Sequence, residues 1–214
     1  MYINRGEMEV KLVNAALNGN ESEVKEILEE NPNINVNWKS EKNPAFAYTA
    51  LHYACYHSHD KVVSLLLAHP DIDVNHKDND GNTPFMYACV KVRTNCVRLM
   101  LRDPRVNPNV PDNDGSTPLW CAASNGLLDN IKWWIASGRD IDLGQPGNEK
   151  TDAIWAAKRE NRPEVATLLE RFKENPEKTR SEVRKELRIT GEWGDSFPIQ
   201  SDFHFKNFSL FFLV

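Results

Sequence analysis

Apolar residues recur along the chain at a fixed step of 34 residues. Each recurring set starts with a small alanine, followed nine residues later by a β-branched residue and then by an apolar pair. The alanines are Ala54, Ala88, Ala122 and Ala156, and the β-branched residues are Val63, Val97, Ile131 and Val165. This spacing predicts two short amphipathic helices in each unit. Because neither helix can bury its apolar stripe alone, the units are expected to stack into one elongated core.

Residues that cap helices and form turns mark where each unit begins. A threonine precedes each alanine by five residues, at Thr49, Thr83, Thr117 and Thr151. A threonine hydroxyl can accept a hydrogen bond from an amide at a helix N-terminus. Pro84 and Pro118 follow two of these threonines, at a position where a helix needs no amide hydrogen. The pattern therefore predicts that a threonine opens the first helix of each unit.

Three segments carry a resemblance to a known family. Residues 78–89 read DNDGNTPFMYAC, residues 112–123 read DNDGSTPLWCAA, and residues 49–55 read TALHYAC. Together with a DVN step at 73–75, these segments closely resemble the ankyrin repeat. The resemblance spans about residues 8–172. It implies an all-α solenoid of stacked helix-turn-helix repeats with short β-hairpin fingers.

The spacing divides the chain into an expected repeat domain and two shorter segments. The domain covers residues 1–172, with five repeats at about 8–38, 49–78, 83–112, 117–146 and 151–172. Residues 173–190 are expected to form a C-terminal cap helix or a linker, because NPEKTRSEVRKELRI at 175–189 has a helical charge pattern after a proline. Residues 191–214 lack the repeat spacing. That tail is irregular or disordered, folds back onto the solenoid, or docks on a partner.

Charge and hydropathy narrow the class of protein. The formal net charge is -5 and the pI is near 5.7, whereas a nucleic-acid binder would normally present a basic face. No apolar run reaches the roughly 18 residues that a membrane-spanning helix needs, and the N-terminus does not resemble an export signal. Cys55 and Cys89 occupy the same position in neighbouring units, so helix packing would hold them about 8 to 10 Å apart, beyond disulfide reach. We therefore expect buried thiols and an intracellular protein, cytoplasmic or nuclear.

The sequence contains no recognisable catalytic or metal-binding arrangement. His52, His57 and His59 lie close in sequence, but their side chains diverge around a helix and no acidic or cysteine partner completes a metal set. Aspartate pairs occur in turns, where turn propensity explains them. We expect no enzyme activity, no cofactor and no metal.

The resemblance also implies where a partner would bind. In ankyrin stacks the finger tips and the exposed side of the first helices form a concave face. By motif position, the concave face of this chain comprises Tyr56, His57, Asn79, Asp80, Asn82, Val90, Lys91, Asn113, Asp114, Ser116, Ser124, Asn125, Lys158 and Arg159. A second row, Tyr53, Tyr87, Cys121 and Trp155, either packs against neighbouring repeats or supplies contact anchors. The mixture of charges favours a mixed-charge protein partner, and we expect the chain itself to be a monomer.

Several positions depart from the family pattern. Val92 and Arg93 replace glycine and histidine, so the turn there is either remodelled or strained. The last repeat has Asp152 in place of proline and is expected to hold its first helix less securely. The leucine, acidic, valine and asparagine positions that end at Asn75 match a pattern that asparagine hydroxylases recognise in ankyrin repeats, although Asn75 is equally explained as a turn residue.

Three functions remain open from the sequence. The first is a non-enzymatic module that binds a protein partner through the concave face, as an adaptor, inhibitor or recruiting subunit. The second is the targeting region of a longer or multi-subunit enzyme, such as a ubiquitin-ligase or signalling complex. The third is a structural spacer.

Overall fold

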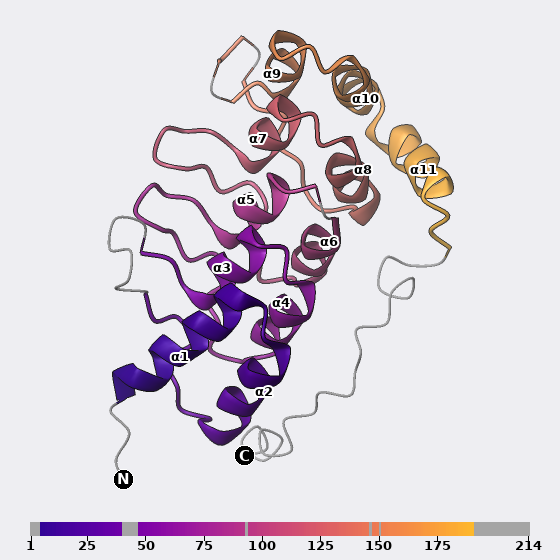
Figure 1. Cartoon of the computed structure of the whole chain (residues 1–214). Helices are drawn as coiled ribbons and strands as arrows, with labels where there is room; N and C mark the ends of the chain where they lie inside the picture. Colours follow the sequence, from indigo (N-terminus) through magenta and orange to yellow (C-terminus); the bar gives the residue numbers. More distant parts are fainter. Residues whose placement is uncertain (1–4, 40–46, 93, 146, 150, 191–214) are drawn as a thin grey trace, which may run out of the picture.

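The computed structural model describes residues 5–39, 47–92, 94–145, 147–149 and 151–190 (Figure 1). These residues form five consecutive helix pairs and one further helix. The pairs are α1 (Arg5–Asn18) with α2 (Glu21–Glu30), α3 (Ala50–Tyr56) with α4 (Asp60–Leu67), α5 (Pro84–Cys89) with α6 (Thr94–Arg102), α7 (Pro118–Ser124) with α8 (Leu128–Ser137), and α9 (Ala153–Arg159) with α10 (Pro163–Glu174). Helix α11 (Pro176–Glu186) follows.

The helices form two layers along the stack. The inner layer consists of α1, α3, α5, α7 and α9, each of which packs on the next, and α2, α4, α6 and α8 pack in the same way in the outer layer (Figure 1). Helix α11 packs against both α8 and α10. The connections between successive pairs project as fingers beyond the inner layer on one side. The expected all-α solenoid is confirmed.

A column of buried side chains joins the inner helices. Leu51, Phe85, Leu119 and Ala153 occupy the same position in four successive pairs, and each is 0 % exposed. The ring of Phe85 meets the ring of Trp134 edge to face, with centroids 5.1 Å apart. Trp134 is itself buried and donates its indole N–H to the carbonyl of Asp140. This column makes each pair depend on its neighbours for burial.

Threonine caps open two of the inner helices as expected. Thr83 accepts a hydrogen bond from the amide of Met86 at 3.3 Å, and Thr117 accepts one from the amide of Trp120 at 3.2 Å. A proline occupies the first helical turn in both cases. These caps satisfy amides that the helix cannot pair internally.

The expectation that Thr151 opens a helix is wrong. Asp152 is the N-cap of α9 and accepts a hydrogen bond from the amide of Trp155 at 2.9 Å. The second carboxylate oxygen of Asp152 accepts from Gly147, while the Thr151 hydroxyl accepts from the amide of Gln145. Threonine and aspartate are both good caps, so the finger contacts decide which of the two is used, and the helix starts one residue later.

The fingers are turns without strands. Among the described residues no strand occurs, in contrast to the short β-hairpins that the family resemblance implies. In one finger Asp78 donates its amide to the carbonyl of Asn82, and in the next Asp112 does the same to Ser116, each at 3.0 Å. The side chains of Asp78 and Asp112 accept amide bonds inside the same turns, at Asn82 and Ser116 respectively. Side-chain and turn bonds therefore replace a strand ladder.

The turn between α5 and α6 is remodelled. Its two counterparts at Ser58 and Gly126 take positive φ values of 60° and 71°. Val92 occupies the equivalent position, but its φ is not positive, and its side chain is 82 % exposed. A β-branched residue is strained at positive φ, so the backbone takes another path at this turn. Arg93, which follows, lies outside the described residues.

A buried asparagine supports this altered turn. Asn130 is 2 % exposed and donates its side-chain amide to the carbonyls of Cys89 at 3.1 Å and Lys91 at 2.7 Å. The corresponding residues of the two preceding outer helices are the apolar Val62 and Cys96, both buried. A polar side chain is accommodated at this core position because it bonds carbonyls of the neighbouring repeat.

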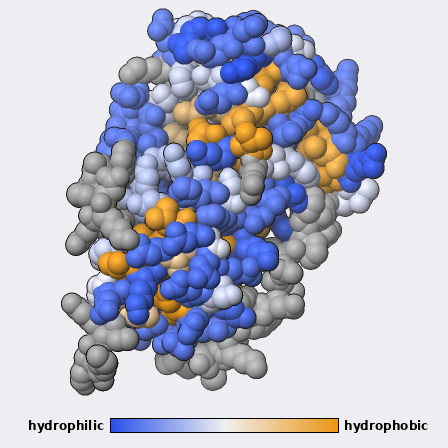
Figure 2. Space-filling model, viewed as in Figure 1, coloured by the Kyte–Doolittle hydropathy of each residue, from blue (hydrophilic) through white to orange (hydrophobic). Residues whose placement is uncertain are grey.

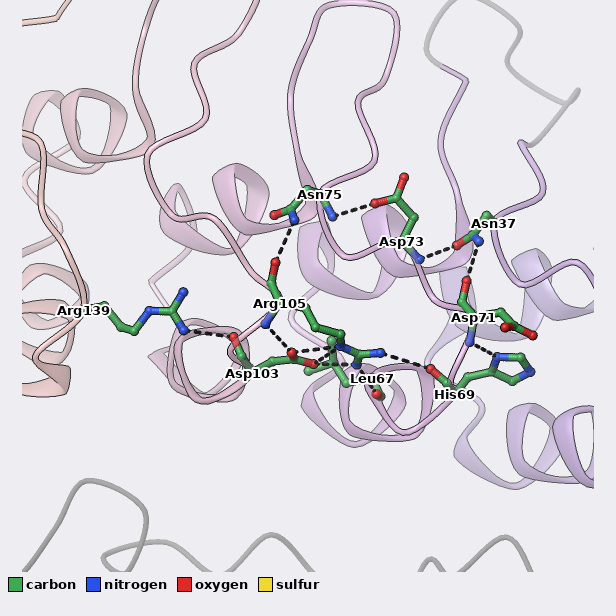
Figure 3. Close-up of polar contacts among 9 residues, drawn as sticks. All are labelled: Asn37, Leu67, His69, Asp71, Asp73, Asn75, Asp103, Arg105 and Arg139. Atoms are coloured by element: carbon green, nitrogen blue, oxygen red, sulfur yellow. Dashed lines mark hydrogen bonds and ion pairs between the residues drawn. The ribbon is translucent and has the colours of Figure 1, made fainter. Parts of the chain in front are cut away.

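A series of asparagines links consecutive repeats near the ends of the outer helices. Asn75 donates its side-chain amide to the carbonyl of Arg105 at 2.8 Å (Figure 3). Its side-chain oxygen accepts from the amide of Asn107 at 2.7 Å. Asn37 makes the same pair of bonds one repeat earlier, and Asn109 does so one repeat later. Both polar groups of each amide are thus used between repeats, which fixes the spacing of the connecting loops.

A parallel series of arginines caps the outer helices. Arg105 donates to the carbonyl of Leu67, the last residue of α4, at 2.6 Å, and Arg139 donates to the carbonyl of Asp103 after α6 at 3.1 Å (Figure 3). Arg180 of α11 extends the series to the end of α8. Cations placed at helix C-termini satisfy free carbonyls and favour the helix dipole. Helix α11 therefore ends the stack with the same contact that joins the repeats.

The remaining expectations concern membrane spans, cysteines and the tail. In the described part of the chain, no helix combines the length and apolar character that crossing a membrane requires. Cys55, Cys89 and Cys96 are buried free thiols and Cys121 is half-buried. Burial raises the pKa of the Cys121 thiol to about 12. The alternatives for residues 191–214 fall outside the described residues, and the division into domains remains a proposal.

Candidate functional site

The concave face expected from the sequence consists of two edges joined by the inner helices. The finger edge comprises Asn79, Asp80, Asn82, Asn113, Asp114 and Ser116, and the helix-end edge comprises Tyr56, His57, Val90, Lys91, Ser124, Asn125, Lys158 and Arg159. Exposure varies from residue to residue along both edges. Exposed members are Tyr56, His57, Asn79, Asp80, Asn113, Asp114, Asn125, Lys158 and Arg159, and half-buried members are Asn82, Val90, Lys91, Ser116 and Ser124. All fourteen therefore keep some contact with solvent. In the view of Figure 2, hydrophobic residues form separate patches among hydrophilic ones and no continuous band.

Two of these residues hold the fingers together. Asn113 donates its backbone amide to the carbonyl of Asp80 at 2.9 Å and its side-chain amide to the carbonyl of Asn79 at 2.8 Å. Asn82 donates its side-chain amide to Asp78 within its own finger at 3.4 Å. These contacts give Asn113 and Asn82 a structural task beside any role in binding. They also position the exposed Asp80 carboxylate at the finger tip.

A tyrosine pair extends this network toward the inner helices. Tyr87 donates its hydroxyl hydrogen to a carboxylate oxygen of Asp78 at 2.6 Å, so its oxygen accepts from Tyr48, 2.8 Å away. Burial, together with the Asp78 contact, raises the pKa of Tyr87 well above its usual range, and burial raises the pKa of Tyr48. Both hydroxyls therefore stay protonated at neutral pH and act as fixed hydrogen-bond donors.

A buried histidine joins the second and third repeats. His52 is 0 % exposed, and its Nδ1 atom accepts from the amide of Thr49 at 3.2 Å. The other ring nitrogen, Nε2, therefore carries the hydrogen and donates to the carbonyl of Asn82 at 3.2 Å. Burial lowers the pKa of His52 to about 4. The ring is neutral at physiological pH and acts as a structural link.

The helix-end edge carries cations that rest on aromatic rings. The Nζ atom of Lys91 lies 3.8 Å from the centroid of the Tyr56 ring. The guanidinium carbon of Arg159 lies 4.6 Å from the Trp155 ring and 5.9 Å from the Trp120 ring. A cation over an aromatic face is held in place by the ring quadrupole. Two defined cationic points therefore mark this edge, one in the third repeat and one in the fifth.

The second row of residues predicted from the sequence, which is mostly aromatic, is half-buried along its whole length. Tyr53, Tyr87, Cys121 and Trp155 all keep an intermediate exposure. Tyr48 contacts Tyr53 and Tyr87 edge to face, with ring centroids 5.1 Å and 5.3 Å apart. The row therefore packs on one side and is open on the other. This arrangement agrees with both predicted roles, packing against neighbouring repeats and contact with a partner.

Metal binding finds no support in the described part of the chain. His57 and His59 stack with ring centroids 5.8 Å apart, but no group of three potential metal ligands gathers among the described residues. His59 has a different contact, from its Nε2 atom to the carbonyl of Leu17 at 3.1 Å. This bond joins the first two repeats.

Asn75 retains two possible roles. Both polar groups of its side chain bond the following repeat, as described above. That geometry explains the asparagine as a structural residue. Hydroxylation of Asn75 stays a prediction, which the appearance of one added oxygen at this residue in a mass spectrum would test.

Sequence reasoning missed Tyr48, Asn130 and the arginine series. Arg105 and Arg139 are separated by the same 34 residues as the helices, so the repeat period could have found them. Asn130 gives no such signal, because its neighbours at the same position are apolar. Tyr48 directly precedes Thr49, and its counterparts at the 34-residue step are Asn82 and Ser116, so the period gives no sign of an aromatic role at this position.

The comparisons with known proteins concern the repeat region. A family model described as ankyrin repeats in three copies matches residues 12–112 and again residues 72–145. Together the two matches cover α2 to α8 and the second half of α1, more than half of the chain. The family model supports about three repeats where the sequence predicts five, whereas the described residues contain five helix pairs, of which α9–α10 lies beyond the matched residues. Comparison with curated proteins gave no match.

Proposed function

Because the chain belongs to the family of ankyrin repeats, we propose that it is a non-enzymatic module that binds another protein through its concave face. Ankyrin repeats are generally protein–protein interaction modules, and the family is generally non-enzymatic. The module would act as an adaptor, an inhibitor or a recruiting subunit. Its partner is a protein whose surface matches this particular set of side chains.

One observation carries the proposal. At the ends of α3, α5, α7 and α9, or within two residues after them, one position recurs every 34 residues and holds His57, Lys91, Asn125 and Arg159. The alanines one turn earlier, at 54, 88, 122 and 156, are at most 1 % exposed, yet this position lies at or near the surface with a different polar side chain in each of the four repeats. Stacking does not require these four side chains. A row of that kind is available for recognition of a partner.

The charges of the two edges also support the proposal. Acidic Asp80 and Asp114 lie at the fingers, and basic Lys91 and Arg159 lie at the opposite ends of the inner helices. An inner helix of about seven residues separates the edges by roughly 10 Å. A partner with acidic and basic groups at that separation would bind in one orientation, because complementary charges set register more than affinity.

A pair of charge-neutral double variants tests the proposal. The chain serves as bait for affinity purification from cell extract, followed by titration of each captured protein against purified variants. Asp114→Lys with Arg159→Glu reverses one charge at each edge, and we expect the affinity for the partner to fall at least about tenfold. The matched control, Arg171→Glu with Glu182→Arg, exchanges an ion pair between α10 and α11 and should leave the affinity unchanged.

Circular dichroism and the melting temperature of both variants should stay close to those of the wild type, because the altered side chains are substantially exposed. A partner that binds the concave-face variant as tightly as the wild type, but loses the control variant, would place the interface on the outer helices. That result would refute the proposal.

A further inference from the structure

The described residues expose large hydrophobic side chains at two positions, and Lys91 connects the two. Tyr56, at the end of α3, is 38 % exposed, and Val92, after α5, is 82 % exposed. Lys91 precedes Val92 directly and lies over the Tyr56 ring. A single exposed apolar residue is ordinary on a protein surface. Here one cation, Lys91, lies over the first exposed residue and directly precedes the second in the chain.

Lys91 differs from the other cations of the concave face in its partners. Lys158 forms an ion pair with Glu170 at 2.6 Å, and Arg159 forms one with Glu160 at 2.7 Å. Lys91 forms no ion pair with any residue that the structure describes, and its recorded side-chain contact is the Tyr56 ring. The charge of Lys91 is therefore not compensated by a neighbouring carboxylate. An acidic group from outside would provide the complement.

The surroundings hold this cation in a fixed place. The Tyr56 ring contacts the rings of His57 and Tyr87 edge to face, with centroids 5.0 Å and 5.5 Å apart. Tyr87 is itself fixed by its bond to Asp78. The ring below Lys91 is thus oriented from two sides. A preorganised cation loses less entropy on binding than a freely moving lysine.

We propose that Tyr56, Lys91 and Val92 form a docking site for a peptide segment of the partner protein that carries a carboxylate next to an apolar side chain. The carboxylate binds the Lys91 ammonium group, and the apolar side chain covers Val92 and the exposed part of the Tyr56 ring. This proposal rests on the proposed function and specifies one part of the concave face. Charge complementarity selects the acidic residue, and the exposed apolar surface selects its neighbour.

The remodelled turn after α5 is the reason that an aliphatic residue follows Lys91 at the surface. The equivalent positions in the neighbouring repeats are Ser58 and Gly126, which take the left-handed conformation and offer little apolar surface. Val92 departs from that conformation, and Asn130 supports the altered turn through the carbonyl of Lys91. The repeat therefore places an exposed aliphatic side chain beside the cation, where the usual turn would place a small residue.

Selection from a random peptide library tests the site directly. The full chain is immobilised, and a phage-displayed library of random 12-residue peptides is panned against it. We expect the selected peptides to be enriched in aspartate or glutamate adjacent to leucine, isoleucine or phenylalanine. Lys91→Glu should weaken binding of these peptides at least about tenfold and should select peptides with a basic residue in place of the acidic one.

The control is Lys178→Glu, which makes the same change of charge at an exposed position of α11. It should leave the selected sequence pattern unchanged. A second readout uses His57, whose pKa is lowered by burial, by His59 and by the charge of Lys91. Binding of a selected acidic peptide should raise the pKa of His57, as followed by NMR titration of its ring.

Any of three results would overturn the docking site. Selected peptides without an acidic preference would do so, as would acidic peptides that bind Lys91→Glu and the wild type equally well. The third result is that phosphorylated peptides bind selectively and the carboxylate peptides do not bind. The site would then have a different ligand, and the proposed docking site would be overturned. If the concave-face double variant still abolished binding of the captured partner, the proposed function would survive any of these outcomes.

Discussion

Gly81 and Gly115 form a matched pair that measures how strongly neighbouring fingers are joined. They occupy the same position in successive fingers, with φ values of 83° and 88°. A Cβ atom added at Gly81 would lie 2.4 Å from Oδ1 and 2.6 Å from the backbone nitrogen of Asn113, whereas one added at Gly115 would meet nothing within 4 Å. The two alanine substitutions therefore share their backbone strain and differ in the contact with the next finger.

The expected energies follow from this difference. An alanine at positive φ costs about 1 kcal/mol, and this applies to both variants. Gly81→Ala also displaces Asn113, which donates to the carbonyls of Asp80 and Asn79 at 2.9 Å and 2.8 Å. Two such bonds contribute about 0.5 to 1.5 kcal/mol each. We therefore expect Gly81→Ala to be less stable than Gly115→Ala by about 1 to 3 kcal/mol.

Urea unfolding followed by circular dichroism measures both variants, and a difference of this size corresponds to a melting temperature lower by about 4 °C. Combining Gly81→Ala with Asn113→Ala completes a double-mutant cycle, in which the loss at Gly81 should shrink once the Asn113 side chain is absent. Equal destabilisation by Gly81→Ala and Gly115→Ala would refute the reasoning, because it would mean that the fingers do not support one another.

Three further predictions concern single residues. Asp152→Ala should lower the unfolding free energy by about 1 kcal/mol and Thr151→Ala by clearly less, since the aspartate caps α9; urea midpoints of the two variants check this. The pKa of His52 falls from its ordinary 6.5 to about 4 on folding, so the wild type should lose about 3 kcal/mol as the pH decreases through that range. His52→Gln should flatten this dependence in unfolding curves recorded at pH 7 and pH 4.5, and an unchanged slope would contradict the assignment. Asn75→Ala should cost about 1 to 3 kcal/mol in the same assay, because both polar groups of the side chain bond the next repeat; a neutral effect would remove its structural role.

The repeat period was sufficient to predict the helices and the stack. Each step combines a capping residue, a small alanine and an apolar pair, and these features act locally, as the caps at Thr83 and Thr117 show. The same logic failed at Thr151, because the next residue is an equally good cap and the finger contacts select it. Local chemistry therefore predicts that a helix begins, but tertiary contacts choose between adjacent capping residues.

Contacts between repeats were harder to predict than the repeats themselves. Asn130 occupies an otherwise apolar core position because its side chain bonds the carbonyl of Lys91, in a remodelled turn 39 residues earlier in the chain. The exposed state of Val92 could be expected from its poor fit to a left-handed turn, whereas the position of Lys91 over the Tyr56 ring depends on two helices packing side by side. The sequence therefore predicts which residues form a concave face, and that set stays a prediction, whereas the contacts among these side chains depend on the fold.

Hydrogen exchange of the chain with and without a captured partner tests the central claim most directly. Binding through the concave face predicts slower exchange in peptides that cover residues 78–91 and 112–125, which contain the fingers and the ends of α5 and α7. Peptides within α4 and α6 of the outer layer should exchange at the same rate in both states. Protection confined to the outer helices, with none at the fingers or inner-helix ends, would contradict the account.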